Sequence, residues 1–203
     1  MIEENNHFDI CALVLAAGKS ERMGSQKLLL PFVGKTIIER VIDNILESGV
    51  GKILVVTGSH REEIEKVIHC LRVSTCYNPN YSDGMHTSVI RGFSAIPENT
   101  GAVMVFLGDQ PFIPEEVIQT IILTWRQSGK GIIIPIYQGK RGHPVLFDLR
   151  LKNDVMLLDP VSGLRSVIVR HPEETVEVEV NFPEILRDID TKNDYITELN
   201  LMK

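Results

Sequence analysis

The sequence predicts an α/β fold in which a mostly parallel, twisted sheet is covered by helices on both faces, giving three layers. Apolar runs recur at 52–57, 101–107 and 131–136, and such runs are typical of strands that are buried on both faces. Segments with helical periodicity stand between the runs, and strands that alternate with helices build parallel sheets. The chain has 203 residues and neither an internal repeat nor a linker, so we expect a single domain over 1–203.

Two capping patterns define the elements of the first half. Thr36 and Glu39 form a capping box that opens a helix, and Gly49 ends it. Ser59 and Glu62 have the same spacing and predict the start of a second helix. The expected strands lie at 9–16, 52–57 and 73–77, the helices at 36–48, 59–71 and 85–95, the turn at 31–35 and the loop at 78–84.

The second half is expected to alternate in the same way. Pro114 at the first helical position and Gly129 beyond the end frame a helix over 114–128. Thr191 is expected to cap a final helix together with Asp194. Strands are expected at 101–107, 131–136 and 175–180, with helical pieces over 148–170 and a short strand that ends at 188–190. The alternating pattern of 175–180 is typical of an edge strand.

Composition excludes several classes of protein. The net charge of −6 argues against a general nucleic-acid binder, because such proteins usually carry a basic face. Three cysteines without a C-x-x-C spacing argue against a disulfide framework or a zinc site. The polar residues 1–9 do not resemble a signal peptide, and no apolar run approaches membrane-spanning length. We therefore expect a cytoplasmic protein that binds neither nucleic acid nor membrane.

A polar, glycine-containing loop follows the first expected strand. Gly18 and Gly24 belong to a segment that carries Lys19, Arg22 and Lys27, three cations over nine positions. Glycine allows backbone N–H groups to converge on an anion, and the cations add the charge that a polyphosphate needs. The loop lacks the first glycine of a Walker A motif and the second glycine of G-x-G-x-x-G, so it predicts a nucleotide-phosphate site of a different kind.

Two aspartates are expected at the same edge of the sheet as this loop. Asp109 follows the strand at 101–107, and Asp190 ends the short strand at 188–190. Ligands of such sheets bind beyond the carboxyl ends of the strands, so one pocket would collect the loop and both carboxylates. Oxygen ligands beside a triphosphate suit Mg²⁺. The alternative for each aspartate is a cap of a helix or a turn.

The thirteen positions from Leu15 to Lys27 read L-A-A-G-x-S-x-R-M-G-x-x-K. This pattern closely resembles the signature of the MobA-like nucleotidyltransferases, which include the molybdenum-cofactor guanylyl- and cytidylyltransferases. The resemblance implies a nucleotide-diphospho-sugar transferase-like, Rossmann-like fold, catalytic roles for Lys27, Arg22 and Asp109, and a Mg²⁺ cofactor on Asp109 and Asp190. The nucleotide-binding residues that it implies are Leu15, Ala16, Ala17, Gly18, Arg22, Gly24, Lys27, Thr87, Ser88, Gly108 and Asp109.

A second segment, G-K-R-G-H-P at 139–144, resembles the family's G-x-R-G-H-P segment near the acceptor. The planar guanidinium of Arg141 is suited to clamping an acceptor phosphate, and His143 is expected to support it. The family's acceptor-side L-x-G-D-x-G-A-R pattern is represented here only by the divergent L-D-P-V-S-G-L-R at 158–165.

The resemblance implies transfer of CMP from CTP to a phosphomonoester, molybdopterin bearing molybdenum above all, with release of pyrophosphate and a molybdoenzyme as the downstream partner. Guanylyl-transferring relatives have L-A-G-G where this chain has Ala17, and the extra methyl favours a pyrimidine. Two alternatives stay open: a sugar- or alditol-phosphate nucleotidyltransferase, and a non-catalytic protein that binds a nucleotide or delivers the cofactor.

Overall fold

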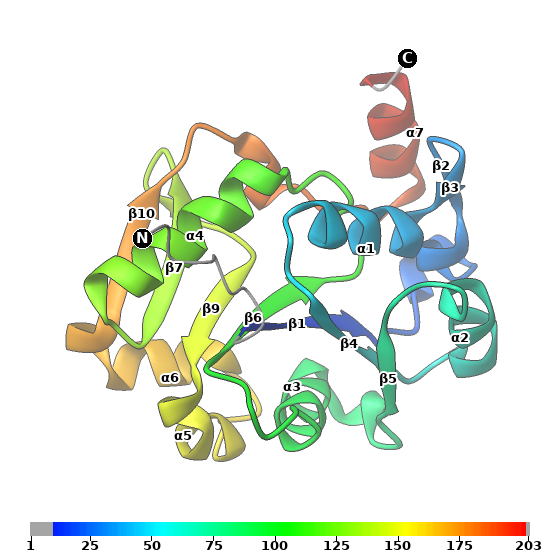
Figure 1. The fold of residues 1–203 in the computed structure, drawn as a ribbon. Coiled ribbons are helices and arrows are strands. Elements are labelled where there is room, and N and C mark those ends of the chain that lie inside the picture. The colour runs from blue at the N-terminus through cyan, green and yellow to red at the C-terminus, as the bar shows by residue number, and fades with distance from the viewer. Residues whose placement is uncertain (1–9, 202–203) are drawn as a thin grey trace.

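The computed structural model describes residues 10–201, except for the side chain of Arg22, and it confirms the predicted fold class. A sheet of eight strands runs through the centre, with helices on both of its faces (Figure 1). Its main path has the order β10-β7-β9-β6-β1-β4-β5, and β8 pairs with β7. The eight strands are β1 (Ile10–Ala16), β4 (Lys52–Thr57), β5 (Ser74–Tyr77), β6 (Ala102–Leu107), β7 (Ile132–Tyr137), β8 (Lys140–Arg141), β9 (Val145–Asp148) and β10 (Thr175–Glu179).

Strand β1 lies in the middle of the sheet and is parallel to both of its neighbours. Val14 is opposite Val55 of β4 on one side and Phe106 of β6 on the other. The sheet is mixed because β9 is antiparallel to both β6 and β7. β10 pairs in parallel with β7 at the edge of the sheet, which confirms the predicted edge strand.

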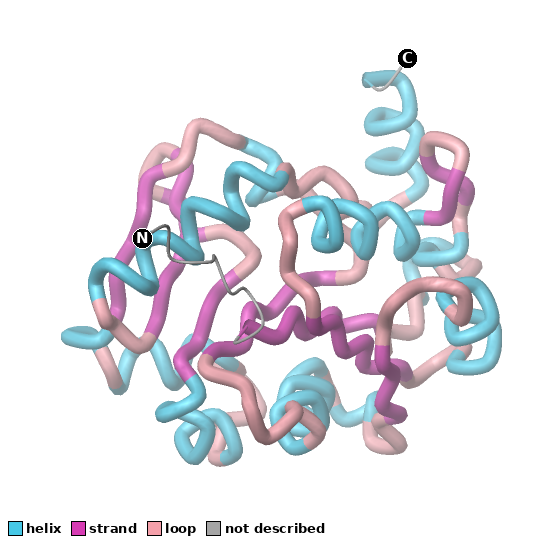
Figure 2. Tube along the Cα trace, viewed as in Figure 1, coloured by secondary structure: helices cyan, strands magenta, loops and turns pink. Residues whose placement is uncertain are grey.

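Seven α-helices are described, and six of them cover the sheet (Figures 1 and 2). They are α1 (Ile37–Glu47), α2 (Arg61–Ile68), α3 (Met85–Ser94), α4 (Glu115–Ser128), α5 (Lys152–Met156), α6 (Leu164–Arg170) and α7 (Lys192–Leu201). Buried residues of α1, α2 and α4 form one apolar cluster with the sheet, and those of α3, α5 and α6 form a second cluster. Within β1, Ala12 and Val14 join the first cluster and Cys11 and Leu13 the second, because successive side chains of a strand face opposite sides.

Two of the three predicted capping pairs are confirmed, and the third is wrong. Thr36 and Glu39 form the predicted capping box of α1. Thr191 and Asp194 bond to each other in the same reciprocal way at the start of α7, since the Thr191 N–H donates to Asp194 Oδ2 (2.7 Å) and the Asp194 N–H to Thr191 Oγ1 (3.2 Å). Ser59 does not cap α2: the cap position is His60, in the left-handed region with φ 57°, and its side chain makes no capping bond.

The prediction of a short strand that ends at 188–190 is wrong. These residues follow a 3-10 turn (Pro183–Leu186) and belong to an irregular segment of the chain.

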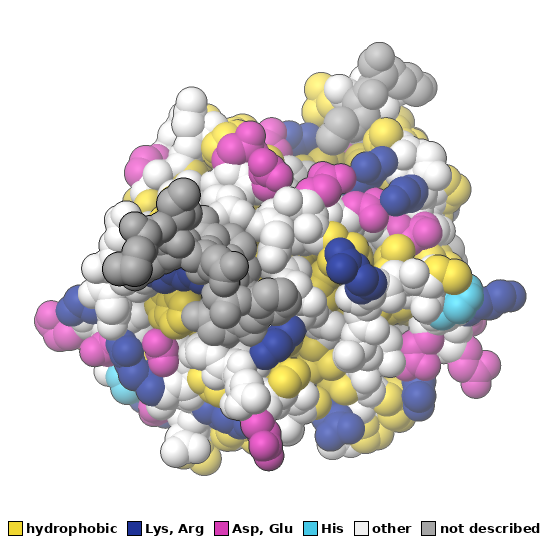
Figure 3. Space-filling model, viewed as in Figure 1, with side chains coloured by type: hydrophobic (Ala, Val, Ile, Leu, Met, Phe, Trp, Pro, Cys, Tyr) yellow, Lys and Arg dark blue, Asp and Glu magenta, His cyan; other side chains and the backbone are white. Residues whose placement is uncertain are grey.

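No described helix is both long and apolar enough to cross a membrane. Acidic and basic side chains are interspersed over the face drawn in Figure 3, and neither sign forms a continuous patch there.

Candidate active site

A cavity of about 530 Å³ lies beyond the carboxyl ends of β1 and β6. Three segments that are distant in the sequence supply its charged side chains: the loop after β1, the start of the loop after β6, and the irregular chain before α7. Its lining residues are Leu15, Ala17, Gly18, Lys19, Ser20, Glu21, Gln26, Lys27, Leu28, Tyr81, Ser82, Met85, Ser88, Leu107, Asp109, Asp188 and Asp190. The predicted meeting of the glycine loop with Asp109 and Asp190 therefore occurs in one cavity.

The glycine loop has two sharp changes of chain direction. Ser20 (φ 55°) and Gly24 (φ 69°) both have left-handed backbone conformations, on either side of a short 3-10 turn at Glu21–Met23. Apolar side chains anchor the loop, because Met23 and Leu28 are buried in the core that α1 and α2 share. These buried side chains hold the loop against the core, while Gly18, Lys19 and Ser20 of the same loop line the cavity.

Close packing joins the start of the loop to the neighbouring strands. A Cβ at Gly58, just after β4, would lie 2.7 Å from both the methyl and the carbonyl oxygen of Ala17. A Cβ at Gly108, just after β6, would lie 2.8 Å from the carbonyl oxygen of Leu15, which already accepts a hydrogen bond from the Gly108 N–H (3.0 Å). Glycine is required at both positions because the backbones approach more closely than a side chain permits.

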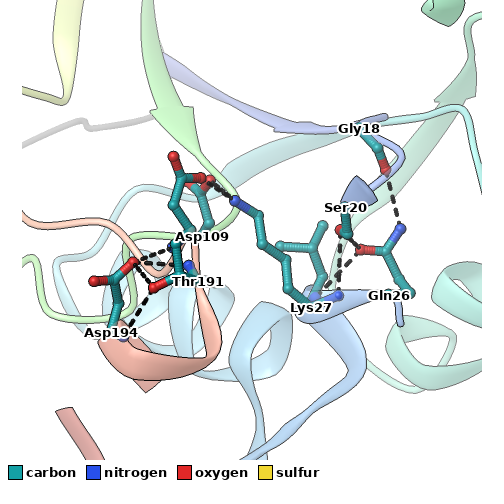
Figure 4. A network of polar contacts seen from close by, with 9 residues as sticks. Gly18, Ser20, Gln26, Lys27, Asp109, Thr191 and Asp194 are labelled. Atoms are coloured by element: carbon teal, nitrogen blue, oxygen red, sulfur yellow. Dashed lines mark hydrogen bonds and ion pairs between the residues drawn. The ribbon is translucent and has the colours of Figure 1, made fainter. Parts of the chain in front are cut away.

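Lys27 joins the two predicted metal-binding aspartates. Its Nζ donates to Asp109 Oδ2 at 2.6 Å and to Asp190 Oδ1 at 2.7 Å (Figure 4). The three side chains are partly shielded from solvent, with exposed fractions of 14%, 20% and 28% for Lys27, Asp109 and Asp190. Burial disfavours the charged form of Lys27, but the charges and hydrogen bonds of the two aspartates outweigh this and raise the pKa of its ammonium group. Lys27 is therefore positively charged throughout the neutral range.

Asp190 reaches the site through backbone contacts and not through a strand. The Ile189 N–H donates to the carbonyl oxygen of Asp109 (3.0 Å), which places the chain before α7 against the loop after β6. The Asp190 N–H donates to Asp194 Oδ2 (3.2 Å), so the capping group of α7 also orients Asp190. Arg187 stacks on the ring of Phe112 at 4.7 Å and pairs with Glu198 of α7, which holds the same segment from its other side.

Asp188 is a third aspartate in the cavity lining, and sequence reasoning gave it no role. Burial, followed by the charges of Asp190 and Asp109, raises the pKa of the Asp188 carboxyl group, while Lys27 opposes this effect. The only sequence feature that could have identified Asp188 was its position two residues before Asp190.

Gln26 is a second cavity residue that sequence reasoning missed. It is 6% exposed, and its side chain contacts several parts of the loop. It occupies a variable position of the signature, so the pattern gave no reason to select it.

The donor set at the cavity fits a hard divalent cation. Asp109 Oδ2 accepts from Lys27, whereas Asp109 Oδ1 is buried and has no hydrogen-bond partner among the described residues. A buried carboxylate oxygen without a partner is costly, and a cation coordinated by oxygen would satisfy it. Among the described residues no group of three or more histidine, cysteine, aspartate or glutamate side chains forms a ready metal cage. Mg²⁺ usually takes one or two carboxylates from the protein and its other ligands from phosphate and water.

The other predicted nucleotide-binding residues differ in their relation to the cavity. Leu15, Ala17, Gly18 and Ser88 line it. The remaining described ones do not: Ala16 is buried in the core beneath, Gly24 is exposed, Gly108 packs on Leu15, and Thr87 donates to the Asn80 carbonyl oxygen. Thr87 Oγ1 and Ser88 Oγ both accept from Asn78 Nδ2 at 2.9 Å. The side chain of Arg22 lies outside what the structure describes, so its predicted role stays a prediction.

The two predicted acceptor-binding residues are separated by the structure. Arg141 is about half exposed on β8 and pairs with Glu177 of β10, so it is not part of the cavity lining. His143 is partly buried and does not line the cavity either; burial lowers the pKa of its imidazole, and the charge of Asp109 opposes this. The structure therefore brings neither residue into the cavity lining, and the roles of Arg141 and His143 toward an acceptor stay predictions.

Comparison with known proteins agrees with this geometry. Residues 12–176 match the family model of the MobA-like NTP transferase domain. The molybdenum cofactor cytidylyltransferase of Escherichia coli (strain K12) is 31% identical over 189 residues, which cover 93% of this chain and 94% of that protein. Among solved structures, a nucleotidyl transferase from Methanothermobacter thermautotroptrophicus is 25% identical, with a TM-score of 0.81 over 95% of this chain and 96% of the other. Rv0371c from Mycobacterium tuberculosis H37Rv is 23% identical and has the same TM-score over 96% and 99% of the two chains, a likeness of fold.

Proposed function

This chain belongs to the MobA-like NTP transferase family and is a nucleotidyltransferase, and from that premise we propose its substrates. The proposed reaction transfers CMP from CTP to a phosphomonoester, the molybdenum-bearing molybdopterin cofactor, and releases pyrophosphate. The name and the near full-length match of the Escherichia coli relative support this nucleotide and this acceptor. A molybdoenzyme would then receive the product.

The observation that carries the proposal is the group formed by Lys27, Asp109 and Asp190 at the cavity. A cation between two carboxylates, 2.6 and 2.7 Å away, shows that the site concentrates negative charge at one point. Asp109 Oδ1, which has no hydrogen-bond partner among the described residues, would also be stabilised by a cation. A protein that only carried a nucleotide would have no use for two converging carboxylates beside a phosphate loop, whereas a transferase that holds Mg²⁺ requires them.

In the proposed reaction a phosphate oxygen of the acceptor forms a bond to the α-phosphorus of CTP. The bond from the α-phosphorus to the bridging oxygen breaks, and pyrophosphate leaves with that electron pair. A phosphomonoester is largely dianionic at neutral pH, with a second pKa of about 6, so the attack needs no strong general base. Among the described residues, the cavity contains no histidine- or cysteine-based nucleophile pair, as this route expects.

The residues of the chain would then act by positioning and by neutralising charge. Lys27 would bind the triphosphate, and the N–H groups of the glycine loop would surround its oxygens. Asp109 and Asp190 would hold Mg²⁺, which neutralises charge on the triphosphate as the leaving group departs. Ala17 at the cavity wall would restrict the base pocket and favour a pyrimidine over guanine.

Pyrophosphate release tests this proposal directly. The native protein should release pyrophosphate from CTP with molybdenum-bearing molybdopterin, faster than from GTP, ATP or UTP, and not with sugar phosphates or alditol phosphates. Asp109→Asn should reduce this release at least a hundredfold at millimolar Mg²⁺, since positioned charge of this kind is worth about 2.7–4 kcal/mol. The matched control is Asp43→Asn, which replaces an aspartate of α1 that pairs with Lys35 and does not line the cavity.

Three outcomes would overturn parts of the proposal. Release of pyrophosphate with a sugar or alditol phosphate, and not with molybdopterin, would show that the acceptor is a different one from that proposed. Binding of CTP without release of pyrophosphate for any acceptor would indicate a non-catalytic carrier protein. Turnover of Asp109→Asn within a few-fold of the native protein, equal to that of Asp43→Asn, would remove Asp109 from the site.

A further inference from the structure

Gln26 connects three parts of the glycine loop through one buried side chain. Its Oε1 accepts from Ser20 Oγ at 2.7 Å and from the Leu28 N–H at 3.3 Å. Its Nε2 donates to the carbonyl oxygen of Gly18 at 3.1 Å and lies 3.5 Å from His60 Nδ1. Figure 4 shows the side chain placed between Gly18 and Ser20, on the far side of Lys27 from Asp109.

The bond to Gly18 determines how the first peptide group of the loop is oriented. In a trans peptide the carbonyl and the following N–H point in opposite directions. Because the Gly18 carbonyl points to Gln26 Nε2, the N–H of Lys19 points away from Gln26. If this peptide turned over, a carbonyl oxygen would take the place of an amide N–H and would repel a bound anion.

The bond to Ser20 holds a residue whose backbone is unfavourable. Ser20 has a φ of 55°, in the left-handed region that is unfavourable for a residue with a side chain. Its Oγ donates to Gln26 Oε1 and accepts from the Lys27 N–H at 3.2 Å, so the two ends of the loop close on each other. Gln26 also caps the short turn at Lys27–Leu29 through the Leu28 N–H, which fixes where the Lys27 side chain starts.

We infer that Gln26 is a positioning residue that locks the glycine loop in its anion-binding form and aims Lys27 at the triphosphate. The inference rests on the proposed binding of a nucleoside triphosphate at this loop. Gln26 acts through Gly18, Ser20 and Lys27 and not through the base, so its effect should be the same for any triphosphate. The amide group is needed because it supplies an acceptor for Ser20 and a donor for Gly18 at the same time.

Calorimetric titration with inorganic tripolyphosphate and with CTP, each with Mg²⁺, tests the inference without an acceptor. Gln26→Met keeps the length of the side chain and removes both polar groups, and it should weaken both ligands by about tenfold or more, to a similar extent. The matched control is Gln119→Met in α4, which removes a similar bond from a glutamine Nε2 to the carbonyl oxygen of Ser48. We expect this control to lower the thermal unfolding temperature without changing either affinity.

Gln26→Glu separates the orienting role from simple packing. Its carboxylate can accept from Ser20 and Leu28 but repels the Gly18 carbonyl, whereas its protonated form regains a donor. At pH 7.5, where an ordinary glutamate is ionised, Gln26→Glu should therefore weaken tripolyphosphate and CTP about as much as Gln26→Met does. An unchanged affinity in folded Gln26→Met or in folded Gln26→Glu would overturn the inference. A native protein that binds tripolyphosphate but not CTP would refute only the proposed nucleotide, whereas one that binds neither would refute both proposals.

Discussion

Replacing Lys27 by methionine would remove the cation that joins Asp109 to Asp190 while keeping a side chain of similar length. In the native protein the ammonium makes bonds of 2.6 and 2.7 Å to the two carboxylates. Because the aspartates raise the pKa of Lys27, this charge is present throughout the neutral range, and the effect of its removal should not depend on pH there. The substitution therefore tests the charge, since most of the packing is retained.

The size of the effect follows from the number and exposure of these contacts. A charge-assisted contact to a triphosphate is worth roughly 1.5–3 kcal/mol, or roughly 10- to 150-fold in the affinity for CTP. The loss of stability should be smaller than the 3–5 kcal/mol typical of fully buried pairs, because the three side chains keep exposed fractions of 14–28%. Because solvent screens these partly exposed charges, we expect the free energy of unfolding to decrease by about 1–2 kcal/mol, which corresponds to a decrease of roughly 2–8 °C in Tm for a protein of this size.

Two measurements on the same variant separate these effects. Calorimetry with CTP and Mg²⁺ gives the nucleotide affinity, and thermal unfolding gives Tm. The control is Lys35→Met, whose native ion pair with Asp43 also has a length of 2.6 Å but lies at the surface, where such pairs contribute at most about 1 kcal/mol. A Lys27→Met protein that binds CTP within twofold of the native protein would refute the assignment of Lys27 to the triphosphate.

Two further predictions concern the cavity wall. Ala17→Gly should narrow the preference for CTP over GTP by roughly tenfold, since one methyl group in a pocket is worth about 1–3 kcal/mol. The measurement is kcat/KM for both nucleotides. Equal use of GTP and CTP by the native protein would contradict a steric role of Ala17. Asp188→Asn should raise Tm by a few degrees at pH 7.5, because burial and the charges of Asp190 and Asp109 raise the folded-state pKa of Asp188, so the native carboxylate costs stability above that pKa. The gain in Tm should disappear as the pH falls below the ordinary pKa of an aspartate, because the native side chain is then protonated in both the folded and the unfolded state. Thermal unfolding of both proteins at pH 7.5 and pH 3.5 measures this. The same gain in Tm at both pH values would contradict the prediction.

The sequence by itself determined the layers of the fold and the main part of the site. Buried strands produce uninterrupted apolar runs, so β4 (KILVVT) and β6 (AVMVFL) could be predicted from composition and length. The capping box of Thr36 and Glu39 is a local interaction over three residues, and it was predictable for the same reason. Asp109 follows its strand directly, so the rule that ligands bind beyond the strand ends placed it correctly.

Only the tertiary structure decided which of the remaining polar residues meet. Asp190 is placed by the bond from Ile189 to the Asp109 backbone and by the docking of Arg187 on Phe112, not by a strand. Gln26 makes its bonds within a loop whose path depends on left-handed residues, and a sequence pattern does not specify such a path. Arg141 and His143 are two residues apart, yet the exposed Arg141 pairs with Glu177 at the sheet edge, whereas His143 is partly buried and its pKa responds to the charge of Asp109. Hydrogen bonds and ion pairs between distant segments depend on the packing of the whole chain, whereas caps and apolar runs depend on neighbours in sequence, and this difference separates what could be predicted from what could not.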